Sequence, residues 1–149
     1  MSHTYSHLLA NFVFSTKERR PWITQDIEME LHAYLGGIAR NIEVTALAIG
    51  GVVDHVHLLV RHPRRISVSD LTRTLTSNSS GWIHEHWPIM LFQWQQGYAA
   101  FSVSESSRSK VMAYIQNQAE HHRTKTFQGE LIELLERHGI EYDLRYLWD

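Results

Sequence analysis

Cysteine is absent from the sequence, which excludes disulfide bonds and thiolate metal ligands. No apolar run reaches the length of a membrane span and no secretory signal is recognisable, so we expect a cytoplasmic protein. The sequence also lacks internal repeats, linkers and low-complexity segments. We therefore expect one folded domain over residues 1–149, in line with an apolar content of 43% and five tryptophans.

A strong excess of positive charge is also missing, because the net charge is −2, and this argues against a general nucleic-acid binder. The charges are unevenly distributed: residues 1–125 hold 12 of the 14 lysines and arginines but only 10 of the 16 acids. Two basic clusters follow predicted strands, where they either hold phosphates or only keep the loops soluble. The acidic tail, residues 126–149, either covers a DNA channel or packs as a cap.

Two histidines inside an apolar segment, residues 54–60, are the most informative feature. Side chains on a strand alternate between the two faces of a sheet, so His55 and His57 lie on one face and Val56 points into a core on the other. Two imidazoles held in this way form a paired donor site for a divalent metal. The same alternation predicts that Asp54 shares the face of Val56, so we assign it no role.

A second pair of polar residues lies on a predicted helix over residues 110–122. Positions i and i+4 share a helix face, so the phenol of Tyr114 and the amide of Gln118 project together. Combined with the histidine pair, they favour metal-assisted attack on a phosphodiester. His121 and His122 fall at the expected C-terminal end of this helix, where cations are favourable, and we assign them no catalytic role.

Hydrophobic periodicity predicts the order β-α-β-β-α-β followed by further helices. This order is typical of a ferredoxin-like split βαβ sheet, so the predicted fold class is α+β, an antiparallel sheet with helices and a C-terminal helical tail. Gly50 and Gly51 are interpreted as a turn or a bulge between two strands. The expected strands are 6–15, 45–53, 55–62 and 93–103 (the last a strand or a hairpin), and the expected helices are 25–41, 67–87, 110–122 and 129–138.

The sequence resembles the single-tyrosine HUH transposases, the IS200-like group and its relatives associated with repetitive extragenic palindromes. A His-hydrophobic-His element followed by a helical Tyr-x-x-x-Gln, in a chain of this size, is a specific combination. The end of the chain resembles the palindrome-associated branch. The matching segments are residues 13–17, 19–20, 54–60, 75–82, 94–103, 114–122 and 139–148.

This resemblance implies a ferredoxin-like or RRM-like sheet that carries the histidine pair on a central strand. It also implies cleavage and rejoining of single-stranded DNA, with Tyr114 as the nucleophile that forms a 5′-phosphotyrosine. His55, His57 and Gln118 would hold the metal, either Mg²⁺, which prefers oxygen ligands, or Mn²⁺, which imidazole suits. By analogy we expect hairpin-forming DNA ends as the partner, and a homodimer with Tyr114 supplied in cis or in trans. The expected DNA-binding residues are Lys17, Arg19, Arg20, Arg61, Arg64, Arg65 and Arg73.

One departure from the family pattern motivates an alternative hypothesis. Family members often carry basic residues over positions 76–81, where this sequence reads Thr-Ser-Asn-Ser-Ser-Gly. The alternative is a domesticated module that recognises nucleic-acid hairpins without cutting them. A third hypothesis, a ferredoxin-like metalloprotein that acts on a small molecule, ranks last because no cofactor-binding motif supports it.

Overall fold

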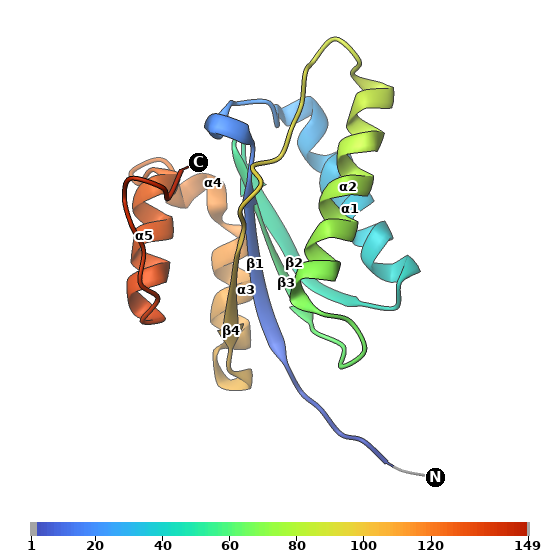
Figure 1. Ribbon diagram of the computed structural model, residues 1–149, viewed down its shortest axis with the longest axis vertical. Coiled ribbons are helices and arrows are strands. Elements are labelled where there is room, and N and C mark those ends of the chain that lie inside the picture. The colour runs from blue at the N-terminus through green and yellow to red at the C-terminus, as the bar shows by residue number, and fades with distance from the viewer. Residues whose placement is uncertain (1–2, 149) are drawn as a thin grey trace.

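The computed structural model describes residues 3–148 and contains a four-stranded antiparallel sheet with helices on both faces (Figure 1). The strand order β2-β3-β1-β4 makes β3 and β1 the central pair. This is the ferredoxin-like arrangement, so the predicted α+β class is confirmed. The elements are β1 (Leu9–Ser15), η1 (Lys17–Arg19), α1 (Gln25–Asn41), β2 (Thr45–Val52), β3 (His55–Arg61), α2 (Val68–His86), β4 (Ala99–Val103), η2 (Glu105–Ser107), α3 (Arg108–Gln116), α4 (Gln118–His121) and α5 (Phe127–Arg137).

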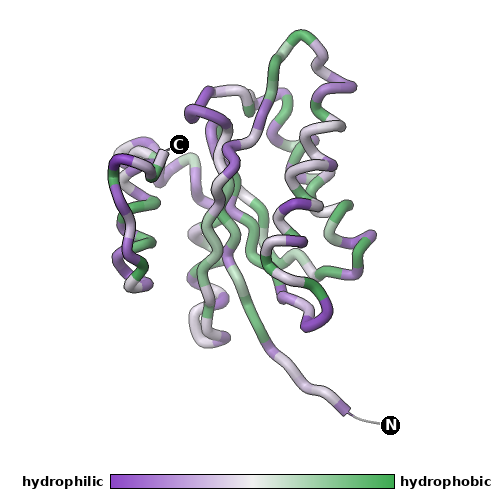
Figure 2. The backbone as a smooth tube through the Cα atoms, viewed as in Figure 1, coloured by the Kyte–Doolittle hydropathy of each residue, from purple (hydrophilic) through white to green (hydrophobic). Residues whose placement is uncertain are grey.

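The largest core lies between the sheet and helices α1 and α2. Alternate residues of β3, namely Val56, Leu58 and Val60, point into this core and are fully buried. They pack with the apolar stripe of α1, in which Leu31 and Leu35 are also fully buried. Figure 2 shows the concentration of apolar residues along the central strands. Within residues 3–148, no helix combines the length and the apolarity that crossing a membrane requires.

The opposite face of the sheet is covered by α3, α4 and α5 (Figure 1). Two smaller apolar clusters hold these helices in position. One contains Leu59 of β3 and Ile115 of α3, and the other packs Phe127 of α5 against β1 and β4. His55 and His57 share the β3 face of Leu59, so the predicted alternation along this strand is confirmed.

The prediction of a turn or bulge at Gly50 and Gly51 is wrong, because both glycines lie within β2 and pair with β3. The connection to β3 is a turn at residues 53–54. Gly50 has a packing role instead, since an added Cβ would lie 2.0 Å from the carbonyl oxygen of Ile115. Helix α3 therefore crosses the sheet in close backbone contact at this glycine.

Two other predicted elements differ from the structure. The helix expected over residues 110–122 is divided at Asn117, whose backbone (φ −103°, ψ 27°) separates α3 from α4. The strand or hairpin expected over residues 93–103 is a regular strand only from Ala99 onward. The boundaries of the remaining helices and strands agree with the sequence prediction to within about three residues.

Helix α2 begins as predicted, because the side chain of Ser67 accepts a hydrogen bond of 3.0 Å from the backbone N–H of Asp70. Further along this helix Ser79 is buried, and its hydroxyl accepts a hydrogen bond of 3.0 Å from the indole of Trp94. Part of the segment that lacks the family's basic residues therefore packs inside the protein.

The contact at Gly50 leads to a stability prediction. We expect Gly50→Ala to lower the free energy of unfolding by about 2 kcal/mol, because the added methyl group would overlap the backbone of α3. Gly81→Ala is the matched control, since a Cβ there meets open space on helix α2. We expect this variant to raise the free energy of unfolding by about 0.5–1 kcal/mol. Urea denaturation measures both values, and wild-type stability in Gly50→Ala would contradict the close contact.

Candidate active site

The two histidines of β3 are fully buried and face the helices α3, α4 and α5. Their rings are 0% exposed and lie 5.3 Å apart, centroid to centroid. The Nε2 atoms approach the same oxygen, Oε1 of Glu130, at 3.3 Å for His55 and 2.9 Å for His57. Two imidazole nitrogens therefore converge on one point, as expected for residues i and i+2 of a strand.

The other two predicted residues come from the helices that cross above the histidines. Oε1 of Gln118 lies 2.8 Å from Nε2 of His55. The ring of Tyr114 lies 5.7 Å from that of His57 at an angle of 84°, and its hydroxyl donates a hydrogen bond to Glu130. The predicted nucleophile and the three predicted metal ligands thus meet within one chain.

Glu130 on α5 is the central residue that sequence reasoning missed. Its carboxylate is 1% exposed, and its ion-pair partners among the described residues are all imidazoles. Its signal in the sequence is an acidic residue at helical spacing between Phe127 and Leu134, on a helix face that is otherwise apolar. That signal marks Glu130 as inward-facing but does not reveal its partners.

Asp54 has a role in the site, contrary to the sequence interpretation. It lies in the turn before β3, where the alternation of a strand does not apply. Its Oδ1 lies 2.8 Å from Nδ1 of His55, on the side of the ring opposite to Gln118. The backbone N–H of Thr16 donates a hydrogen bond of 2.9 Å to the Asp54 carbonyl, which fixes this turn to the end of β1. Asp54 therefore orients the imidazole of His55.

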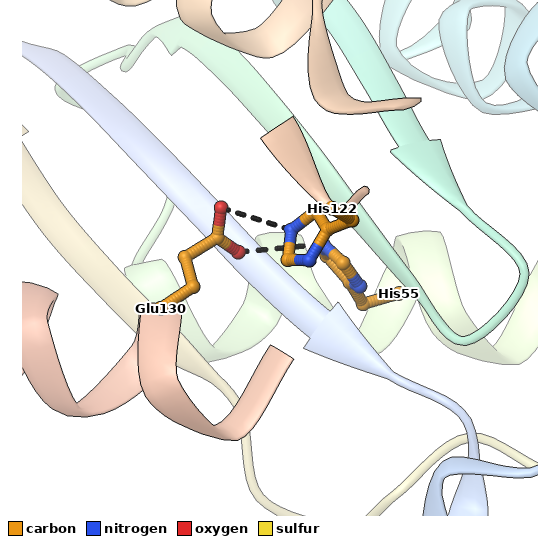
Figure 3. Close-up of side chains that lie close together, drawn as sticks. All are labelled: His55, His122 and Glu130. Carbon is orange, nitrogen blue, oxygen red and sulfur yellow. Dashed lines mark ion pairs between the residues drawn. The ribbon is translucent and has the colours of Figure 1, made fainter. Parts of the chain in front are cut away.

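His121 and His122 also contact the site, so the view that they only complement a helix C-terminus is wrong. Nε2 of His122 lies 3.1 Å from Oε2 of Glu130. Figure 3 shows this ion pair together with the one between Glu130 and His55. The rings of His122 and His55 are 4.6 Å apart. The ring of His121 lies 4.3 Å from that of Tyr114.

Of the two alternatives left open for the acidic tail, the contacts of α5 support packing as a cap. Phe127 stacks on the ring of His55 at 4.4 Å and 27°, and Leu135 packs with Phe101 of β4. Together with the carboxylate of Glu130, these contacts close the histidine face of the sheet. Helix α5 of the tail therefore caps the histidine face of the sheet and contributes Glu130 to the candidate site.

The donor atoms at this point fit a divalent cation. One ligand atom from each of His55, His122 and Glu130 lies within 4.8 Å of the other two. Nε2 of His57 and Oε1 of Gln118 border the same point. Imidazole nitrogens combined with amide and carboxylate oxygens suit ions such as Mn²⁺, and the oxygen atoms also suit Mg²⁺.

The carboxylates set the protonation of the histidines. Burial lowers the pKa of His55, but hydrogen bonds and charge from Asp54 and Glu130 outweigh burial and raise that pKa to about 9. Burial lowers the pKa of His57, and Glu130 offsets this only in part. In the metal-free protein the two carboxylates therefore favour the protonated form of His55, whereas burial favours the neutral form of His57.

The pKa values of Glu130 and Tyr114 are shifted in opposite directions. Burial alone would raise the pKa of Glu130, but hydrogen bonds from His122, His55 and His57 hold it well below its ordinary value. Burial raises the pKa of Tyr114, and the hydrogen bond to Glu130 raises it further. The phenol is therefore a weak nucleophile unless additional positive charge lies close by.

Tyr114 and Glu130 border a cleft of about 320 Å³ between α3 and α5. The phenol is partly exposed to this cleft, whereas the two histidines of β3 and Gln118 are buried. The cleft is also lined by Asn11, Lys110, Val111, His121, Lys125, Glu133, Leu134 and Arg137. Three cationic side chains thus lie around the tyrosine, and Lys125 is paired with Glu133 at 2.6 Å.

The predicted DNA-binding residues fall into groups that lie far apart. The segment with Lys17, Arg19 and Arg20 follows β1 at the end that pairs with His55, and the Arg19 guanidinium lies over the Trp148 ring. Arg61 is at the opposite end of β3, about 20 Å from His55 at strand spacing.

The remaining arginines of that prediction lie on the surface away from the histidines, and two of them, Arg65 and Arg73, have partners within the protein. Arg64 lies with Arg61 and Arg65 around one surface pocket. Arg65 donates to the carbonyl of Ile42 at the end of α1. Arg73 is exposed on α2, on the other side of the sheet, and pairs with Asp70. The structure thus brings only the Lys17–Arg19 segment and its neighbour Arg20 to the histidine end of the sheet.

The carboxylates around His55 give a pH prediction. Since the pKa of His55 is raised above the ordinary value of about 6.5, its stabilisation is fully present below pH 6.5 and is lost as the pH rises through about 9. Asp54→Asn should lower this pKa, and the exposed Asp26→Asn should not. NMR titration of the histidine rings in metal-free protein measures it, and an unchanged pKa in Asp54→Asn would contradict the assigned contact.

The sequence matches a known protein family. A family model described as "Transposase IS200 like" matches residues 4–118. The matched segment includes the histidine pair, Tyr114 and Gln118, and it ends before α5. Transposases for insertion sequence element IS200 from Salmonella typhimurium and Salmonella typhi are each 28% identical over 130 residues, which cover 80% of this chain and 82% of theirs.

Solved structures share the fold. A candidate transposase from Deinococcus radiodurans has a TM-score of 0.65 at 22% identity, over 79% of this chain and 96% of that chain. A REP-associated tyrosine transposase, solved with a bound REP hairpin, has a TM-score of 0.56 at 15% identity, over 77% and 70% of the two chains. Because the family model covers well over half of the sequence, the chain belongs to the IS200-like transposase family, whose activity is the cleavage and transfer of DNA.

Proposed function

We propose that this protein is a metal-dependent single-stranded DNA transposase that cleaves and rejoins DNA through a 5′-phosphotyrosine on Tyr114. The observation that carries the proposal is the convergence of Tyr114 with the donor atoms of His55, His57 and Gln118. A tyrosine, two imidazoles and an amide around one point supply both a nucleophile and a cation site, as the chemistry of a phosphodiester requires.

Nε2 of His55, Nε2 of His57 and Oε1 of Gln118 would hold the cation, Mg²⁺ or Mn²⁺. When bound, such an ion would neutralise charge on the scissile phosphate and favour the phenolate of the nucleophile. The imidazole of His55 is held for this task by Asp54, since a carboxylate on the far ring nitrogen fixes the orientation of a ligating histidine.

Tyr114 carries out the covalent step. Its oxygen forms a bond to phosphorus while the bond between phosphorus and the 3′-oxygen breaks, and the 3′-oxygen takes up a proton and leaves as a hydroxyl. The hydroxyl of Tyr114 donates a hydrogen bond to Glu130, which orients the phenol, and the proton that the phenol loses balances the one that the 3′-oxygen takes up. The 3′-hydroxyl of another strand can reverse the step, which rejoins DNA without an external energy source.

The cleft beside Tyr114 is the proposed path for DNA. The histidines are buried, so the phosphate would approach from the partly exposed side of the phenol, where Lys110, Lys125 and Arg137 provide positive charge. Lys17, Arg19 and Arg20 would contact DNA near the histidine end of the sheet. Arg61, Arg64, Arg65 and Arg73 would contact only parts of the DNA distant from the cut. A hairpin-forming substrate is proposed because a related transposase was solved with a REP hairpin.

The central test is the covalent adduct. We expect wild-type protein, incubated with Mn²⁺ or Mg²⁺ and end-labelled single-stranded DNA from both flanks of its gene, to form a DNA–protein band that survives denaturing electrophoresis. Tyr114→Phe should abolish this band, because the attacking oxygen is removed. Tyr34→Phe is the matched control, since Tyr34 stacks on Trp82 at 4.7 Å, away from the site, and should leave the band unchanged.

Absence of the band would favour the alternative function. Suppose that wild type binds the hairpin without cleaving it, and that Tyr114→Phe binds the hairpin with the same affinity. The protein is then a hairpin-binding module that has kept the fold. The lack of basic residues over positions 76–81 is the feature that favours this alternative.

The predicted homodimer bears on which chain provides the tyrosine. Within one chain Tyr114 already contacts the carboxylate that binds the histidines, so a cis site needs no second copy. We therefore expect that a mixture of Tyr114→Phe and His57→Ala proteins does not recover cleavage in the adduct assay. Recovery of the band in the mixture would contradict the cis arrangement and would demonstrate a dimer with Tyr114 supplied in trans.

A further inference from the structure

Glu130 is a buried anion without a permanent cation beside it. The side chain is 1% exposed, and its ion-pair partners among the described residues are imidazoles, with no lysine or arginine. Removing a carboxylate from water is unfavourable unless charge and hydrogen bonds compensate for it. Imidazoles that ligate a metal through Nε2 are neutral, so in a metal-loaded site the ion would supply the compensating charge.

The distances around Oε1 of Glu130 match the spacing of ligands around a shared ion. Oε1 lies 2.9 Å from Nε2 of His57 and 3.3 Å from Nε2 of His55, and the latter lies 2.8 Å from Oε1 of Gln118. Neighbouring ligands of an octahedral ion with bonds of about 2.1 Å are about 3.0 Å apart. An oxygen at the position of the ion itself would lie about 2.1 Å from each nitrogen. Oε1 therefore lies at the spacing of a neighbouring ligand atom, which is also the spacing of its hydrogen bond with His57, and not at the position of the ion.

From this geometry we propose that Glu130 is a metal ligand, through Oε1, in addition to His55, His57 and Gln118. The proposal rests on the proposed function, since it concerns the same cation. It extends the site beyond the segment that the family model matches, because α5 follows residue 118. A carboxylate adds a hard, negatively charged oxygen to two imidazoles and an amide, which strengthens binding of Mn²⁺ and Mg²⁺.

The second carboxylate oxygen gives this ligand a positioning role. Oε2 accepts the hydrogen bond of the Tyr114 hydroxyl and one of 3.2 Å from Nε2 of Gln118. One carboxylate therefore connects the proposed cation to the nucleophile. The packing of Phe127 on His55 places α5, and with it this carboxylate, beside the histidine pair.

Mn²⁺ binding tests the proposal without DNA. Isothermal titration of the metal-free full-length chain with Mn²⁺ should give a weaker affinity for Glu130→Gln than for wild type, by about tenfold or more. Glu136→Gln is the matched control, because Glu136 lies on the same helix, is exposed and accepts a hydrogen bond of 2.9 Å from the hydroxyl of Tyr142, and the Mn²⁺ affinity should stay near that of wild type. His57→Ala should bind more weakly than wild type, which identifies the site being titrated.

Two results would overturn the proposal. One is the absence of Mn²⁺ binding to wild type. The other is an affinity of Glu130→Gln that equals or exceeds that of wild type, which would mean that the carboxylate only fills the space a phosphate takes. If Glu130→Gln fails to fold, anomalous diffraction from wild-type crystals soaked in Mn²⁺ decides instead. Manganese density bonded to Oε1 supports the ligand, and density on the histidines without this contact rejects it.

Failure of the Mn²⁺-binding test can be distinguished from failure of the DNA-cleavage test. If wild type forms the Tyr114 adduct and Glu130→Gln leaves the Mn²⁺ affinity unchanged, Glu130 is not a ligand and the proposed function stands. A chain whose Mn²⁺ affinity depends on Glu130 but that forms no adduct rejects the cleavage and keeps the ligand.

Discussion

Strand β3 lies between β1 and β2 and is buried on both faces, and the rest of the structure depends on this constraint. One set of alternate side chains enters the core with α1 and α2, so the other set must enter the layer beneath α3, α4 and α5. Two histidines in the second set are thereby held rigidly out of water. Gly50 completes the arrangement, because its missing side chain lets α3 pass close to the sheet.

Charge compensation then organises the covering helices. The imidazoles of His55, His57 and His122 surround the carboxylate of Glu130, which also receives the hydroxyl of Tyr114. These groups come from a strand, from the region of α3 and α4, and from α5, so the site is a junction of elements. The proposed path for DNA to this junction is the cleft between α3 and α5.

The family assignment and the site geometry support each other. The segment matched by the transposase family carries the proposed nucleophile and three proposed metal ligands, and it folds into the sheet and its first crossing helices. The remaining residues are acidic, and they close the histidine face with an aromatic ring and a carboxylate. The C-terminal helix therefore places a carboxylate beside the proposed catalytic residues, which lie in the matched segment.

The sequence by itself determined the fold class and four residues of the site. Tyr114 and Gln118 meet as expected, although Asn117 divides the single helix on which that expectation rested. His55 with His57 follows from strand periodicity, which fixes where a side chain points relative to its own element. The same rule was wrong for Asp54, because that residue lies in a turn. Only the tertiary structure decided the roles of His122 and Glu130, since local periodicity does not specify which distant element a side chain meets. Glu130 is 73 residues from His57, and the packing of α5 across the sheet brings them together.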